Sequence, residues 1–350
     1  LPKKMFKNSG KIPFQNCRCN RCENFVLGVS AAIGTGFQGL DRRIKPNCLA
    51  SICFVPNKGQ EREIYASRRE CLHRTCLRCK HKFSLAVTEA NPNLDLSKEM
   101  HWTQWGWRYR SKLNAKGQRV KEAYREITRE GTRADLLGSL KLQILDLPLH
   151  MWVYNWQADQ LTLCKESLIF GEVIMIVDFA KNITLPRQYE VQHGFFYRKS
   201  VTLHPVVMYY YQHGHCKVLT HDEFMCVSKD MVHDAHAVFT YVTSALKHLN
   251  MQGTVVTKIY IFSDNCAVQY KSKLPFELLQ FYGIPAEHHF QGAGHGKGEA
   301  DGYIGRLKQM VDKEIRRGKA KIQDALELYV WCTRNGKSSV KITPGDEHCV

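Results

Sequence analysis

The sequence lacks a stretch of about 18 consecutive apolar residues, which is the least that a membrane-spanning helix needs. Its first residues, Leu1 to Lys4, do not resemble the start of a secretory signal peptide. It also shows no internal repeat and no low-complexity tract. We therefore expect a globular protein without a membrane partner, and we expect these 350 residues to be a piece of a longer chain.

Acidic residues are scarce in the first part of the chain. Residues 1–90 contain 17 Lys and Arg against six Asp and Glu, and residues 91–150 contain 11 against seven. Residues 151–350 are almost balanced, with 22 against 20. Such an uneven distribution predicts that the N-terminal part binds a polyanion such as nucleic acid, rather than being only a solvated basic segment.

Residues 101–121 contain no acidic residue at all, but they combine aromatic and basic side chains. Cations neutralise phosphates and aromatic faces stack on unpaired bases, so this stretch could contact nucleic acid. The alternative is a small core built from Trp102, Trp105 and Trp107. We favour the core for most of the tryptophans and contact with the DNA backbone for the cations.

Cysteine is unevenly distributed too, because eight of the 14 cysteines lie in residues 1–90. Disulfide frameworks normally accompany secretion, whereas clustered cysteines in a basic intracellular chain more often bind zinc. The best candidate is Cys71-x4-Cys76-x2-Cys79, because a CxxC pair lets two thiolates reach one tetrahedral ion. Cys71 or His73 would add a third ligand. For the fourth we favour Cys17-x-Cys19-x2-Cys22, with Cys48 and Cys53 as further possibilities. We expect structural zinc within residues 17–79, as one ion or two; buried free thiols are the alternative.

Four domains or regions follow from these patterns: a zinc-binding region (1–90), a basic aromatic and helical linker (91–150), an α/β core (151–335) and a tail or the start of a further segment (336–350). Apolar runs and alternation predict strands at 173–177, 200–211, 217–227 and 255–262. Helical spacing predicts helices at 237–249 and after Gly302, and another from about Lys121 to Leu147 that Pro148 ends. Strands followed by a helix, a strand and a helix indicate a mixed sheet covered by helices.

Two of the predicted strands end in an aspartate, Asp178 and Asp264. Because sites in open sheets form beyond the carboxyl ends of the strands, both carboxylates meet if the strands are neighbours. A third acidic pair, Glu299 and Asp301, precedes a predicted helix. Convergent carboxylates repel one another unless cations neutralise them, and Mg²⁺ prefers oxygen ligands. Two such ions, about 3.5–4 Å apart, stabilise the attacking and leaving oxygens of a displacement at phosphorus. The alternative is that these aspartates only form turns or caps.

At these residues the sequence resembles a family of DDE-type transposase-like proteins that is spread through invertebrate genomes. The resemblance runs from about Glu70 to Lys313, and its motifs are specific in combination. They are Asn155-Trp156-Gln157, Val177-Asp178-Phe179-Ala180 with Asn182, Glu190-Val191-Gln192, Ser200 through Val207, Ser263-Asp264 with Cys266 through Lys273, and His295-Gly296-Lys297 with Asp301-Gly302.

The resemblance implies an RNase H-like fold that cleaves and joins DNA with Mg²⁺ or Mn²⁺. Carried over, Asp178, Asp264 and Asp301 are the catalytic, metal-binding carboxylates, and Glu299 is the rival for the third position because many DDE enzymes end in glutamate. His295 and Lys297 would contact a phosphate of the substrate. The implied partner is DNA, as transposon ends and target, with a homo-oligomer as a possibility, and the implied location is the nucleus.

Three positions depart from the family pattern. Lys181 stands where an acidic residue is usual, Asn265 where glycine is usual, and Arg306 in place of a second glycine. None of these changes removes a carried-over carboxylate. They leave open a catalytically inactive, transposase-derived DNA-binding protein as the alternative, and a plain nuclease of the same fold as a weaker one.

Overall fold

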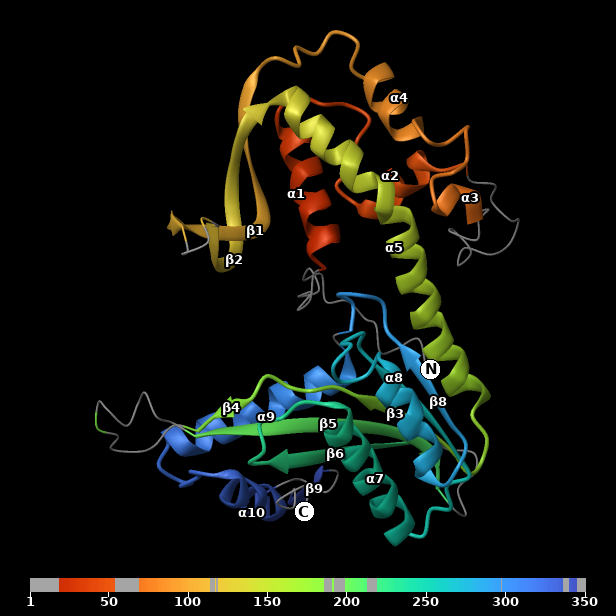
Figure 1. Ribbon diagram of the computed structural model, residues 1–350, viewed down its shortest axis with the longest axis vertical. Helices are drawn as coiled ribbons and strands as arrows, with labels where there is room; N and C mark the ends of the chain where they lie inside the picture. The colour runs from red at the N-terminus through yellow and green to blue at the C-terminus, as the bar shows by residue number, and fades with distance from the viewer. Residues whose placement is uncertain are drawn as a thin grey trace. The chain divides into compact units, whose positions relative to one another are not determined.

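The structure is a computed structural model, and it describes residues 19–53, 69–113, 117, 119–185, 191, 199–212, 219–296, 298–335 and 340–344. The chain divides into two compact units, Leu1–Trp156 and Gln157–Val350 (Figure 1). The Cys-rich region and the region that we expected to be a separate linker thus belong to one unit. Among the described residues, no helix is both long enough and apolar enough to cross a membrane.

The first unit is built mainly from helices. In chain order its elements are α1 (Asn20–Gly34), α2 (Ile44–Ser51), α3 (Arg69–Leu72), α4 (Lys82–Glu89), β1 (Glu99–Leu113), β2 (Arg119–Thr132) and α5 (Arg133–Ser167), whose last residues belong to the second unit. Its core forms where the apolar face of α1, with Phe25 and Val29, packs against Leu140 and Ile144 of α5. The two helices approach closely at Gly28, because a Cβ there would lie only 2.9 Å from the Leu140 side chain.

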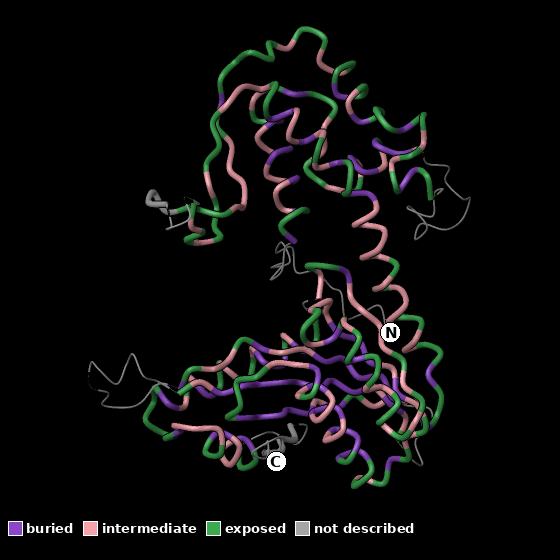
Figure 2. The backbone as a smooth tube through the Cα atoms, viewed as in Figure 1, coloured by how far each residue is buried: buried purple, intermediate pink, exposed green. Residues whose placement is uncertain are grey.

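Strands β1 and β2 form an antiparallel hairpin that the sequence did not predict. Residues 121–132, expected to be helical, are in β2 instead, and most of their side chains are exposed. Apolar periodicity therefore gave no signal for this strand, and the cross-strand contacts that define it, such as the ion pair from Arg108 Nε to Glu122 at 3.3 Å, are not visible in a local pattern. Figure 2 shows this hairpin mostly as exposed and intermediate backbone.

The tryptophans of β1 differ in their surroundings. Trp102 packs against the core of the first unit, as a structural role requires. Trp105 stacks on Tyr124 with 6.4 Å between ring centroids. Trp107 is 42% exposed, and the Lys121 ammonium lies 4.9 Å from its ring centroid. The hairpin thus exposes Trp107 with a cation beside it, and it exposes Tyr109 and Tyr124 as well.

Helix α5 does not end at Pro148, as expected, but continues to Ser167. A proline inside a helix removes one backbone hydrogen bond and costs about 3 kcal/mol. Pro148 is itself buried next to Leu147, and Leu136, Leu140 and Ile144 of the same helix are buried in the core. Burial of this long apolar stripe offsets the local cost, so tertiary packing overrides the stop signal.

The second unit is built around a seven-stranded mixed sheet with the order β8-β7-β3-β5-β6-β9, in which β4 pairs with β5. Its strands are β3 (Glu172–Val177), β4 (Ile183–Thr184), β5 (Ser200–Tyr211), β6 (Leu219–Ser228), β7 (Lys258–Ser263), β8 (Ala286–Phe290) and β9 (Val340–Pro344). Strand β5 lies between β3 and β6 and is antiparallel to both. Strand β7 is parallel to β3, and β8 is parallel to β7.

Helices cover both faces of this sheet (Figure 1). They are α7 (Ala235–Met251), α8 (Lys273–Leu278), the 3₁₀ helix η2 (Leu279–Tyr282), α9 (Glu299–Arg316) and α10 (Ala325–Asn335). The apolar stripe of α7, with Val242 and Leu249, packs on one face, and α9 and α10 pack on the other. The Asp234 side chain begins α7 as its N-cap, because it accepts a hydrogen bond from the Ala237 N–H at 2.9 Å.

Most of the elements predicted for this unit are present. The strands expected at 173–177, 200–211, 217–227 and 255–262 correspond to β3, β5, β6 and β7, and the expected helices to α7 and α9. The prediction of a mixed sheet covered by helices is therefore confirmed. Central strands are fully buried and read as continuous apolar runs, which is why the sequence reveals them.

Candidate functional sites

A cluster of four cysteines lies in the first unit. The sulfur atoms of Cys53, Cys71, Cys76 and Cys79 are all within 4.8 Å of one another, so the cluster could hold a metal ion. Cys71 lies within the short helix α3, Cys76 and Cys79 form the CxxC turn, and Cys53 follows the end of α2 by two residues. Of the two residues considered for the third ligand, Cys71 is in the cluster and His73 is not. Cys53 takes the position for which Cys17, Cys19 or Cys22 had been preferred.

Two basic side chains hold the segment of Cys53 against the CxxC turn. Arg74 donates hydrogen bonds to the carbonyl oxygens of Ser51 and Lys80, and Lys82 Nζ donates to the Ile52 carbonyl at 2.8 Å. Arg74 has a φ of 61°, a left-handed conformation that turns the chain sharply between Cys71 and Cys76. These contacts bring a distant cysteine to the local motif.

The electrostatics of the cluster suit a bound cation. Backbone hydrogen bonds from Cys79 and Arg78 lower the pKa of the Cys76 thiol to about 7. Burial raises the pKa of Cys79 to about 12, and burial also raises the pKa of Cys71. Four adjacent thiolates repel one another unless a positive ion neutralises them, and four thiolates are a ligand set of structural zinc sites.

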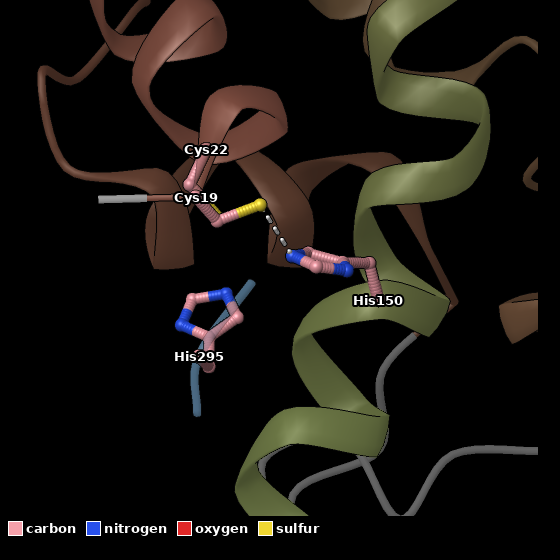
Figure 3. Close-up of side chains that lie close together, drawn as sticks. All are labelled: Cys19, Cys22, His150 and His295. Atoms are coloured by element: carbon pink, nitrogen blue, oxygen red, sulfur yellow. Dashed lines mark hydrogen bonds between the residues drawn. The ribbon is translucent and has the colours of Figure 1, made fainter. Parts of the chain in front are cut away.

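The remaining predicted zinc ligands lie elsewhere. Cys17 lies outside the described residues. Cys19 and Cys22, at the start of α1, belong to a different group of potential ligand atoms, in which His150 of α5 takes part (Figure 3). Cys48 is buried in α2, where burial raises the pKa of its thiol to about 12, and it belongs to neither group.

Asp178 and Asp264 follow neighbouring parallel strands of the second unit. In the register of this pair, Ile176 lies opposite Phe262. Each aspartate is therefore two residues beyond a matched pair, at the same edge of the sheet. The condition under which the two aspartates come to the same edge, that their strands are neighbours, therefore holds.

Both aspartates continue the side of their strand that faces α9. Along β3, Val173, Met175 and Val177 pack on the α7 side, and Ile174 and Ile176 on the opposite side. The alternation continues past the strand, with Phe179 on the α7 side and Ala180 on the α9 side. Because successive side chains alternate, Asp178 belongs to the α9 side, and by the same argument so does Asp264, two residues after Phe262.

The charges of both carboxylates act on one buried tyrosine. Tyr270 is fully buried, and its hydroxyl lies 3.3 Å from Nε2 of His204, another fully buried residue. Burial raises the pKa of Tyr270 well above its ordinary value, and the negative charges of Asp178 and Asp264 raise it further. Both aspartates are therefore close enough to act on the same phenol. Sequence reasoning assigned no role to Tyr270 or His204.

The glycine-rich loop before α9 packs against Asp264. The loop begins where the Gln291 N–H donates to the Ser263 carbonyl at 2.8 Å. At Gly296 an added Cβ would lie 3.4 Å from Cβ of Asp264, so the backbone passes close to the aspartate. His295 is the preceding residue of this loop, and Lys297 lies outside the described residues.

The first turn of α9 carries both rivals for the third carboxylate, and their surroundings differ. Glu299 accepts a hydrogen bond from the Tyr209 hydroxyl at 2.5 Å and forms an ion pair with Lys165 at 3.0 Å. Tyr209 pairs with Ile174, which is four residues, or about 13 Å of strand, before Asp178. The Glu299 carboxylate is thus already engaged by Tyr209 and Lys165, at a point on the sheet away from the ends of β3 and β7.

The Asp301 carboxylate has fewer side-chain partners than the Glu299 carboxylate. One of its oxygens accepts the Gly298 N–H at 3.1 Å. Lys308, two helical turns along on the same side of α9, donates to the carbonyl of Lys181, three residues after Asp178. Burial lowers the pKa of Lys308, while the charge of Asp301 raises it. Asp301 therefore lies on the side of α9 that reaches the segment following Asp178.

The three aspartates are not drawn into one tight cluster. Among the described residues, the groups of ligand atoms within 4.8 Å of one another contain cysteines, and Asp178, Asp264 and Asp301 do not form such a group. They share one edge and one side of the sheet. Carboxylates that surround two ions about 3.5–4 Å apart need not be within contact distance of one another.

The second unit is thus a mixed α/β domain with acidic side chains at the ends of neighbouring parallel strands. Residues 157–345 match the model of a family described as a domain of unknown function, DUF8701. This match covers more than half of the chain, and the chain belongs to that family. It begins at the residue where the second compact unit begins. A comparison with curated proteins finds no match.

Proposed function

We propose that the protein is a DNA transposase of the DDE type, whose second unit cleaves and joins DNA strands with the help of divalent metal ions. The observation that carries this proposal is the parallel register of β3 and β7, which puts Asp178 and Asp264 at the same edge and on the side of α9. Asp301, in the first turn of α9, supplies the third carboxylate. Nucleic-acid chemistry of this type requires such a convergence of acidic residues.

The topology of the sheet supports an RNase H-like fold. Three antiparallel strands follow one another in the chain, and the sheet is then extended beside the first of them by two parallel strands, with α7 between the two sets. The RNase H-like fold of DDE enzymes has this order. The helix that carries the third acidic residue follows the last of these five strands, as the proposal requires.

The donor set at this edge fits Mg²⁺ or Mn²⁺, which take oxygen ligands. Bound there, the ions would neutralise the carboxylates and stabilise charge on phosphate oxygens during displacement. Asp178, Asp264 and Asp301 would hold them. Gly296 lets the backbone approach Asp264, and the buried Tyr270, whose pKa both aspartates raise, forms a hydrogen bond with the buried His204.

The first unit would bind the DNA outside the reacting phosphate. Residues 1–150 carry the excess of basic residues, and the hairpin offers Trp107 with Lys121 beside it. We assign a structural zinc ion to Cys53, Cys71, Cys76 and Cys79, which would fix the turn between α3 and α4. Phosphate contacts by such cations weaken as salt increases.

Nicking of supercoiled plasmid tests the proposal. The full chain should nick DNA with Mg²⁺ or Mn²⁺ but not with EDTA, and Asp264→Asn should reduce nicking to background while keeping DNA binding. Asp312→Asn, an exposed aspartate of α9 paired with Arg316, is the matched control and should nick at the wild-type rate. Nicking by Asp264→Asn at the wild-type rate would remove Asp264 from the site.

The same assay separates the two rivals on α9. Asp301→Asn should abolish nicking, whereas Glu299→Gln should retain most of it, because Glu299 is bound to Tyr209 and Lys165. The opposite pattern would make Glu299 the third carboxylate.

The alternative is a DNA-binding protein that has lost catalysis, and one observation favours it. Asn265, where the family pattern has glycine, donates to the Gln291 carbonyl and so ties the end of β7 to the glycine-rich loop. Salt-dependent DNA binding without metal-dependent nicking in any preparation would support this alternative.

A further inference from the structure

A second group of metal-ligand atoms lies in the first unit, at the start of α1. Cys19 and Cys22 come from the N-terminal turn of this helix, and both are 7% exposed. His150 comes from α5, and its imidazole is directed toward Cys19 (Figure 3). The ligand atoms of these three residues lie within 4.8 Å of one another. Three soft or borderline ligands from two helices thus meet at one buried point.

The distances suit a tetrahedral ion. Cys19 Sγ lies 3.3 Å from Nε2 of His150. Around a tetrahedral zinc ion with usual bond lengths, sulfur and nitrogen ligands are roughly 3.5–3.8 Å apart. Small side-chain rotations therefore suffice to place all three ligands around one ion.

The local chemistry also calls for a cation. Two buried thiols side by side are costly to ionise without a positive charge between them. Zinc supplies that charge and binds thiolate and neutral imidazole together, as in Cys₂His₂ and Cys₃His sites.

This group is separate from the four-cysteine cluster, because the two share no residue. It also has a different mechanical consequence. The four-cysteine cluster joins segments within residues 53–79, whereas Cys19, Cys22 and His150 join the start of α1 to α5, across 128 residues of chain or more. Structural zinc contributes directly to folding, and a long closed loop makes such a link effective.

We infer that Cys19, Cys22 and His150 bind a second zinc ion, which fastens the beginning of α1 to α5 of the first unit. These three residues are the ligands that the first unit supplies. The inference concerns the first unit alone and does not depend on DNA cleavage by the second.

Zinc content of the full chain, purified with zinc and freed of loosely bound metal, is the test. The wild type should contain about two zinc ions per chain, and His150→Ala about one. Cys76→Ser should also contain about one, and the double variant about none. His73→Ala is the matched control, since His73 is an exposed histidine beside the four-cysteine cluster but outside it, and it should keep both ions.

Cadmium NMR of the same proteins distinguishes loss of one metal site from general misfolding of a variant. Cadmium-113 shifts depend on the number of thiolate ligands, so the wild type should give two signals. His150→Ala should lose only the signal with fewer thiolates, and survival of the other signal would show that the rest of the unit is folded. A single zinc ion in the wild type, or an unchanged zinc content and two unchanged signals in His150→Ala, would overturn the inference.

Discussion

The two units of this chain are held together in different ways. The second has a continuous core on both faces of a sheet, with Val173, Met175 and Val206 fully buried at its centre. The first has a smaller apolar core, and clustered cysteines form part of it. A sheet with two covered faces stabilises itself by burial, whereas the proposed zinc ions would add stability to the first unit. The two units also differ in charge, because the first concentrates basic residues and the second has carboxylates at one edge of its sheet.

Removal of metal should show the largest difference between the units. A zinc chelator should abolish hydrogen-exchange protection in residues 69–90 of the full chain, because structural zinc contributes on the order of 10 kcal/mol in small metal-held domains. Strands β3, β5 and β7 should keep their protection. Unchanged exchange in residues 69–90 after complete loss of zinc would contradict the comparison.

A cavity in the second unit should have the next largest effect. Phe224 of β6 is fully buried, and Phe224→Ala should lower the free energy of unfolding of this unit by about 3–5 kcal/mol. Hydrogen exchange of β5 and β6 measures the loss, which should be the same with and without chelator. Phe281→Ala, at a position 65% exposed, is the control and should have a much smaller effect. An equal decrease in the free energy of unfolding in the two variants would contradict the burial of Phe224 in the core.

Acid should weaken the second unit through its buried histidines. Burial lowers the pKa of His204 to about 3 and that of His288 to about 4, so the unfolded chain binds protons that the folded chain excludes. Stability is therefore complete above the unfolded pKa of about 6.5 and falls with pH below it, by about 1.4 kcal/mol per pH unit for each histidine. Urea unfolding at about pH 7 and about pH 5 measures this slope. His204→Phe should reduce it, and an unchanged slope would show that His204 is not the buried titrating group.

A surface ion pair should matter least. Arg316 and Asp312 pair at 2.8 Å on the exposed side of α9, one turn apart. Arg316→Ala should change the free energy of unfolding by less than about 0.5 kcal/mol, because water and salt screen such pairs. Urea unfolding at low and high salt measures it, and a loss above 1.5 kcal/mol would mean that this end of α9 carries more of the fold than its exposure indicates.

How much the sequence could predict also differs between the units. Strands β3 and β7 are visible as buried apolar runs, and the aspartates after them predict their common edge, which the register confirms. In the first unit the hairpin escapes prediction because its strands are largely exposed, and α5 runs through Pro148 because its buried stripe outweighs the proline. Apolar patterns in the sequence thus reveal buried strands but not exposed ones.

Site residues that are far apart in the chain could not be predicted from the sequence. Spacing identifies Cys71, Cys76 and Cys79 as a motif, but only folding selects Cys53 among several candidates. His150 has no sequence signal, because nothing near it in the chain suggests a ligand. Glu299 and Asp301 are equivalent in sequence, and they become distinguishable only when Tyr209 and Lys165, from β5 and α5, are brought to Glu299.

The most direct test of the proposed carboxylate site is Mn²⁺ binding to the full chain, with its zinc sites filled, followed by electron paramagnetic resonance of the free ion. The account predicts saturable binding at the edge of the sheet that Asp178→Ala abolishes or weakens at least tenfold, with Asp312→Asn binding as the wild type does. Equal Mn²⁺ affinity and stoichiometry in the wild type and in Asp178→Ala would contradict it.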